Sequence, residues 1–137
     1  MEHALISLMP FHVICDRWDI GGMSSPAYGE DCVPAIFIYD GYEGGIGLAE
    51  KGYTIFPELI ALALLLVREC PCDEGCPACV YSPKCGNDNQ PMDKEAAIVI
   101  LNELLRAVGT TFGEAGESRS DRERGVPCTV SEGTTGL

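Results

Sequence analysis

Two segments of helical length stand out in the pattern of apolar and polar positions. The first, PELIALALLLVRE at 57–69, begins with Pro57, which the first turn of a helix tolerates, and it is apolar on almost every side. The second, KEAAIVILNELLRAV at 94–108, follows Asp93, a suitable N-cap, and precedes Gly109, a suitable stop. Its recurring apolar face comprises Ala97, Leu101, Leu104 and Val108. We therefore expect one buried helix and one amphipathic helix on the surface of the core.

The N-terminal part of the chain divides into shorter pieces. HALISLM at 3–9 predicts a short helix that Pro10 ends, because proline interrupts the hydrogen-bond ladder of a helix. FHVIC at 11–15 has the composition of a strand. Residues 21–29 are rich in glycine, serine and proline, which predicts a polar loop.

A continuous run of apolar, aromatic and β-branched residues follows, VPAIFIY at 33–39, and is typical of a strand buried on both faces. Pro34 places the start of this strand at a sheet edge, since proline cannot donate to the ladder. A glycine-rich connection, DGYEGGIGLAEKG at 40–52, leads to the first long helix. The whole pattern predicts a small α+β domain, with a few strands packed on two main helices.

The composition changes near Gly109. Residues 110–137 are mostly glycine, serine, threonine and charged residues without any apolar period, so they cannot offset the entropy of ordering. We expect a domain over 1–109 and a disordered tail over 110–137.

The charge of the chain limits its partners. Its 137 residues include 21 acidic and nine basic ones, for a net charge of −12, whereas an autonomous nucleic-acid binder needs a basic surface. There is no apolar run of about 18 residues and no basic flank or cleavage site of a signal peptide at the N-terminus. We expect a cytoplasmic protein without a membrane partner.

The cysteines carry the clearest chemical signal. Five of the eight lie between the two long helices in the segment CPCDEGCPACVYSPKCGN, namely Cys70, Cys72, Cys76, Cys79 and Cys85. Zinc (Zn²⁺) prefers four thiolates in a tetrahedron, and a C-x2-C turn brings two sulfurs to one ion. Cys76 and Cys79 form such a half-site, the turn at PKCG favours Cys85 as the next ligand, and Cys72 is the fourth. Cys70 is an alternative ligand.

Other interpretations of these thiols remain open at this point. The cluster could be unligated reduced thiols, a redox pair at CPAC or an iron–sulfur site. A redox pair usually follows a strand and starts a helix, whereas Cys76 and Cys79 follow a helix in a loop of glycine and proline. Zinc is therefore favoured. The isolated Cys15, Cys32 and Cys128 are expected to be small core or tail residues.

Three further features allow both a functional and a structural interpretation. A metal or acid–base site could be imagined from His3, His12, Asp16 and Asp19. The glycine-rich connection could bind a phosphate, and Trp18 could stack on a base. We favour the structural alternatives: turn hydrogen bonds at the two aspartates, a tight turn or docking surface at the glycines, and a partly buried tryptophan.

Three segments together resemble a known family. The cysteine block with the following QPMDKEAA, the segment EHALISLMPFHVICDRWDIGG and the segment AIFIYDGYEGGIGLA resemble, in the same order, the MrfA-type zinc-binding domain. That domain lies at the C-terminus of a family of bacterial, archaeal and fungal DNA helicases. The resemblance covers about residues 1–107 and is most specific in the cysteine block.

The resemblance implies a zinc-binding accessory domain of an ATP-dependent DEAD/DEAH-box helicase that unwinds DNA with 3′ to 5′ polarity in DNA repair. The sequence has no G-x-x-x-x-G-K-[ST] loop and no acidic helicase box, so we expect no enzyme activity from this chain by itself. Its expected partner is a helicase motor protein or domain, and DNA is expected only through that motor. The alternatives are an iron–sulfur or metal-dependent enzyme domain, or an inert remnant of a split helicase gene.

Overall fold

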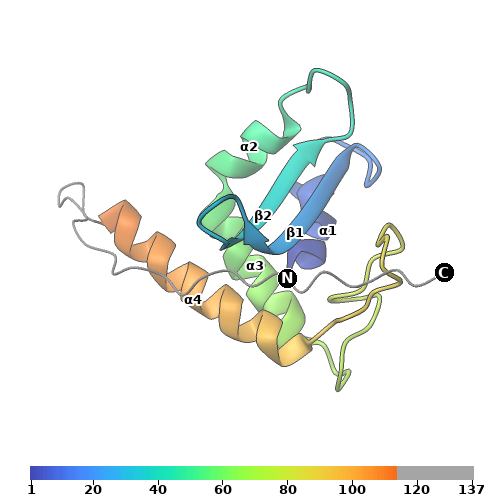
Figure 1. Ribbon diagram of the computed structural model, residues 1–137, viewed down its shortest axis with the longest axis vertical. Coiled ribbons are helices and arrows are strands. Elements are labelled where there is room, and N and C mark those ends of the chain that lie inside the picture. The colour runs from blue at the N-terminus through green and yellow to red at the C-terminus, as the bar shows by residue number, and fades with distance from the viewer. Residues whose placement is uncertain (114–137) are drawn as a thin grey trace.

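The computed structural model of the protein describes residues 1–113 (Figure 1). The elements are α1 (Glu2–His12), β1 (Ile20–Tyr28), β2 (Val33–Asp40), α2 (Leu48–Thr54), α3 (Phe56–Glu69) and α4 (Lys94–Gly113). The predicted α+β class is confirmed: the described residues form four helices and a two-stranded antiparallel sheet. Of the disordered tail predicted at 110–137, residues 110–113 belong to α4, and residues 114–137 lie outside the described part of the chain.

The two long helices form where the sequence places them. Pro57 lies in the first turn of α3, and the backbone amide of Ala96 donates to Asp93 Oδ1 at 2.8 Å, which caps α4. α4 does not stop at Gly109 but continues to Gly113, because one glycine costs a helix only about 1 kcal/mol. Nor is α3 buried all round, since Leu65 is exposed.

The predicted break at Pro10 is wrong, and so is the strand at 11–15. Pro10 lies inside α1, which continues to His12, and the amide of Val13 donates to Met9 O at 2.9 Å where the helix ends. A proline this close to a C-terminus removes one hydrogen bond from a helix that has almost finished. The strand-like residues at 11–15 therefore complete a helix and then leave it.

The polar loop predicted at 21–29 is also wrong, because most of it forms β1. β1 pairs antiparallel with β2 in a hairpin, with Gly21 opposite Tyr39. An added Cβ at Gly21 would lie 2.3 Å from the Tyr39 ring, and one at Gly22 would lie 2.5 Å from Glu2 Oε1. These glycines thus allow an aromatic ring and helix α1 to approach the backbone of the strand closely.

β2 confirms the strand predicted at 33–39, with Pro34 near its start. It is not buried on both faces, since its residues are half-buried or exposed. A hairpin of two strands packs only one face against a small core. The apolar run of β2 therefore belongs to a strand that is partly covered by its neighbours, not to a central strand of a larger sheet.

The glycine-rich connection is half loop and half helix, because α2 begins at Leu48. The Asp40 carboxylate accepts four backbone hydrogen bonds at 2.5–3.2 Å, from Ile46, Gly47, Leu48 and Ala49. The bonds from Ala49 and Ile46 contribute most to lowering the pKa of Asp40. Asp40 therefore occupies the amides that a phosphate would need, and the connection serves as a turn between β2 and α2.

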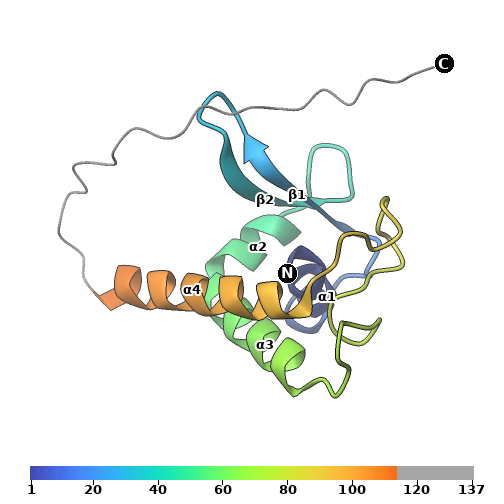
Figure 2. The ribbon, with the colours of Figure 1, turned by 60° about the horizontal axis from the view of Figure 1, so that its bottom comes forward.

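The core lies around α3, which packs against both α1 and α4 (Figure 2). Its fully buried large side chains are Leu5, Met9, Ile20, Leu59, Ile60, Leu101, Val67 and Val80. The hairpin packs on α1, and α2 packs on β2. No helix within 1–113 combines the length and the apolar character that crossing a membrane requires.

Candidate metal centre

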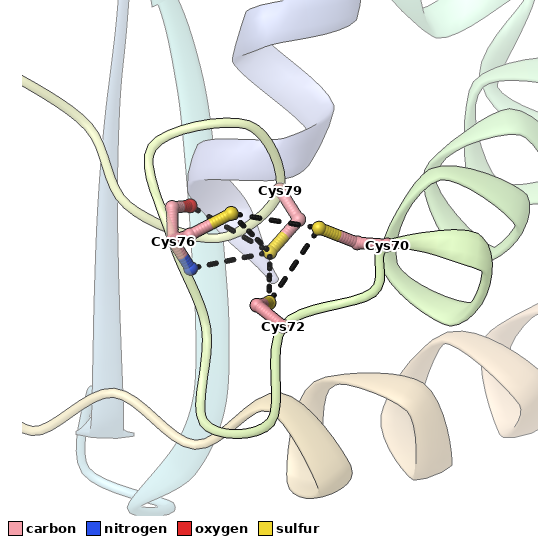
Figure 3. Close-up of side chains that lie close together, drawn as sticks. All are labelled: Cys70, Cys72, Cys76 and Cys79. Carbon is pink, nitrogen blue, oxygen red and sulfur yellow. Dashed lines mark hydrogen bonds between the residues drawn. The ribbon is translucent and has the colours of Figure 1, made fainter.

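Four cysteine sulfurs meet at the end of α3. The Sγ atoms of Cys70, Cys72, Cys76 and Cys79 all lie within 4.8 Å of one another and belong to free thiols (Figure 3). Cys70 lies 3.5 Å from both Cys72 and Cys76, Cys79 lies 3.5 Å from Cys72, and Cys76 lies 3.8 Å from Cys79. Four sulfurs at about 2.3 Å from a central zinc would be about 3.8 Å apart, so the donor set fits that ion.

The end of α3 supplies the first two sulfurs. Cys70 follows the last helical residue with φ −65° and ψ 127°, which turns the chain out of the helix. Cys72 comes two residues later, and Gly75 then adopts φ 124°. An added Cβ at Gly75 would lie 2.5 Å from Val80 Cγ2, so only glycine fits where the loop folds back over the second pair of cysteines.

The second pair forms a tight turn. Cys76 O accepts hydrogen bonds from the amides of Cys79 at 3.0 Å, Val80 at 3.2 Å and Tyr81 at 3.1 Å. The Cys76 amide in turn donates to Cys79 Sγ at 3.4 Å. This turn holds both sulfurs on one side of the loop, an arrangement that the C-x2-C spacing allows.

Two side chains from distant helices hold the backbone of this loop. The buried Lys94, at the start of α4, donates from Nζ to Cys70 O at 2.7 Å and to Cys72 O at 2.5 Å. The buried His3, in α1, donates from Nδ1 to Val80 O at 2.9 Å. The centre is therefore tied to α1, α3 and α4 by contacts that sequence analysis did not identify.

Cys70 and Cys79 differ in how readily they lose a proton. Hydrogen bonds, first from the Cys72 amide and then from the Cys76 thiol, lower the pKa of Cys70 to about 7. Burial raises the pKa of Cys79 to about 12, because a buried thiolate is poorly solvated. A metal ion must displace a proton from Cys79 at any physiological pH.

Cys85 is not one of the four, although the sequence favoured it over Cys70. It lies in a second loop in which Asn89 binds Ser82 twice, accepting from its amide at 2.7 Å and donating to its carbonyl at 3.1 Å. The Cys85 amide donates to Ser82 O at 3.2 Å. Hydrogen bonds within the chain therefore close this loop. The sequence pattern alone is equally compatible with a loop that is closed by a metal ion.

The other candidate groups do not assemble into a site. Asp19 Oδ2 accepts from the Asp16 amide at 2.7 Å, and Asp16 Oδ1 accepts from the Trp18 amide at 3.0 Å, which are the turn hydrogen bonds expected there. His3 is committed to Val80 O. Trp18 is 65% exposed, more than predicted, and Lys84 Nζ lies 5.3 Å from the centroid of its ring.

The sequence of this chain matches a known protein family and several known proteins. The MrfA Zn-binding domain family matches residues 1–80, a range that contains the four clustered cysteines and excludes Cys85. The uncharacterized protein MJ1572.1 of Methanocaldococcus jannaschii is 42% identical over 108 residues, covering 77% of this chain and 96% of that protein.

Longer relatives contain the same domain within a larger chain. The ATP-dependent helicase YprA of Bacillus subtilis is 38% identical over 80 residues, which cover 58% of this chain but 11% of YprA. A crystal structure of the DUF1998 helicase MrfA bound to DNA superimposes with a TM-score of 0.62 at 32% identity, covering 75% of this chain and 13% of MrfA. The chain thus corresponds to a small part of these helicases and to nearly all of the archaeal protein. On the match to residues 1–80, this chain belongs to the MrfA Zn-binding domain family.

Proposed function

We propose that the chain binds one zinc ion through Cys70, Cys72, Cys76 and Cys79 and acts as an accessory domain of a DNA helicase motor. The observation that carries the proposal is the set of four free sulfurs at the spacing of a tetrahedral site, inside the residues that the zinc-binding family matches. Cys72, Cys76 and Cys79 keep the roles predicted from the sequence, and Cys70 takes the place predicted for Cys85.

A structural role suits this donor set better than a catalytic one. Structural zinc sites use four protein ligands, whereas catalytic sites keep one position open for water or substrate. When bound, zinc supplies a link between four thiolates that are separated along the chain. Cys70 and Cys72 continue from α3, and Lys94 at the start of α4 holds their carbonyls, so the bound centre fixes the junction of the two helices.

The partner in this proposal is the ATP-dependent motor of a DNA helicase. The support is that YprA and MrfA, which contain a similar domain, are helicases, and that the crystal structure of MrfA contains DNA. Because this chain is acidic, contact with DNA is proposed only through the motor. Unwinding with 3′ to 5′ polarity, DNA repair and a cytoplasmic location belong to the same proposal.

The motor partnership has a direct test. The chain is mixed with a purified DEAD/DEAH-box DNA helicase motor, and ATP hydrolysis on single-stranded DNA and unwinding of a 3′-tailed duplex are measured. We expect a complex on size-exclusion chromatography and a higher rate of unwinding than with the motor alone. A zinc-loaded chain that neither binds the motor nor changes its rates would contradict the accessory role and favour an inert remnant.

The affinity for zinc is expected to rise with pH. Binding must remove the Cys79 proton throughout the physiological range, because the pKa of Cys79 is about 12. Cys70, with a pKa of about 7, must release a proton only at lower pH. The slope of log affinity against pH should therefore become shallower by about one as pH rises through 7. Competition with a zinc-binding dye between pH 6 and 8.5 measures this slope, and an affinity that rose as the pH fell would refute the assignment of thiolate ligands.

A further inference from the structure

A large groove separates the hairpin from α4. Its volume is about 1330 Å³, and its apolar lining includes Ile36 and Ile38 from β2, Phe56 from α3, and Ile100 and Leu104 from α4. Figure 2 shows the hairpin standing apart from α4, with α2 and the start of α1 between them. None of the four clustered cysteines lines the groove.

The size and exposure of the groove suit a polypeptide segment. Pockets for small molecules usually have volumes of about 300–1000 Å³, which is less than this groove offers. Two of its apolar side chains, Tyr53 and Ile100, are 80% and 45% exposed and would be covered by an occupant. A contiguous apolar surface of this kind marks an interaction site in a small domain.

The charge around the groove selects among possible occupants. Residues 1–109 contain 16 acidic residues and six basic ones. Glu2 and Asp93 line the groove, and Lys84, the single lysine or arginine among its described lining residues, donates from Nζ to the carbonyls of Arg17 and Ile20. Nucleic acid and a second copy of this chain are both negatively charged and would be repelled.

We infer that this groove binds an apolar segment flanked by lysine or arginine residues on a protein partner. Such a segment places its apolar side chains against Ile36, Phe56 and Ile100 and its cations near Glu2 and Asp93. The inference rests on the proposed function in one respect: the partner that the groove would bind is the helicase motor. Apolar contact supplies most of the affinity, and the opposite charges supply selectivity and a faster association.

The test uses synthetic peptides, so that its outcome is independent of the motor. A labelled 18-residue helical peptide of leucine and lysine is titrated with the zinc-loaded chain at 0.15 M salt and followed by fluorescence anisotropy. The comparison probes are the matching leucine–glutamate peptide and a single-stranded oligonucleotide. We expect micromolar binding of the leucine–lysine peptide alone.

Two variants on α4 locate the binding. Ile100→Lys places a charge in the groove and is expected to weaken peptide binding by about tenfold or more. Val99→Lys makes the same change of charge at a 60% exposed neighbour that does not line the groove, and should leave binding unchanged. Both variants should melt as the wild type does, since a lysine head at either position reaches water.

Three results would overturn the inference: equal binding by Ile100→Lys and Val99→Lys, preference for the oligonucleotide or the acidic peptide, or self-association of the chain that covers the groove. Failure of the motor experiment with success here would instead leave the groove as a binding site whose protein partner is not a helicase.

Discussion

Replacing Cys79 with serine is expected to abolish cooperative unfolding and to reduce bound zinc to well below one ion per chain. Cys79 is 4% exposed and its sulfur contacts those of Cys72 and Cys76, so its removal leaves three of the four clustered thiols. Structural zinc contributes about 10–16 kcal/mol of apparent binding free energy, comparable to the whole stability of a domain, about 5–15 kcal/mol. Thermal unfolding followed by circular dichroism, together with metal analysis, measures both effects.

The matched control is Cys85→Ser, which removes a thiol from the same cysteine segment, fifteen residues after Cys70. Because Cys85 lies in the loop that Asn89 closes, this variant should keep the zinc ion and the sharp melting transition of the wild type. A Cys79→Ser protein that melted as cooperatively as the wild type would contradict the role of the metal centre in folding.

Replacing Lys94 with methionine should produce the next largest effect. The Lys94 ammonium is 8% exposed and donates to the carbonyls of Cys70 and Cys72, and methionine keeps the apolar stem while losing both donors. Each hydrogen bond from a charged group contributes about 1.5–3 kcal/mol, so a loss of about 3 kcal/mol or more in the free energy of unfolding is expected. The positive charge of Lys94 would also offset part of the net negative charge that four thiolates and a zinc ion would carry together.

Urea unfolding measures the stability of this variant, and the rate of zinc transfer to a chelator measures how firmly the centre is held. Transfer should be faster from Lys94→Met than from the wild type. Lys51→Met is the control. Lys51 is exposed on α2, and replacing it removes the same positive charge at a position far from the cysteines in sequence. Equal stability of the two variants would show that Lys94 does not support the centre.

The long helices could be predicted because their signals are local. Pro57 and Asp93 act on the backbone next to them, and the apolar faces of α3 and α4 repeat within each segment. β1 could not be predicted, because its glycines are explained by Tyr39 and Glu2, which are distant in sequence. The continuation of α1 through Pro10 was missed because the cost of a proline depends on how near the helix end lies.

At the metal centre, the sequence identified the cysteine segment and the turn of Cys76 and Cys79. The sequence favoured Cys85 over Cys70, although spacing along the chain allows either to reach the same point. The choice depends on where α3 ends and on the pairing of Asn89 with Ser82, which are properties of the folded loop. One overlooked signal was Lys94 itself: a cation in the first turn of a helix opposes the helix dipole, which indicates another role for that side chain.

The most direct test of the central claim is the zinc content of purified Cys70→Ser and Cys85→Ser, measured by native mass spectrometry beside the wild type. We predict one zinc ion per chain in the wild type and in Cys85→Ser, and a large loss of zinc in Cys70→Ser, because Cys70 lies 3.5 Å from two of the other sulfurs. Retention of zinc by Cys70→Ser with its loss from Cys85→Ser would contradict the assignment of Cys70, Cys72, Cys76 and Cys79 as the ligands.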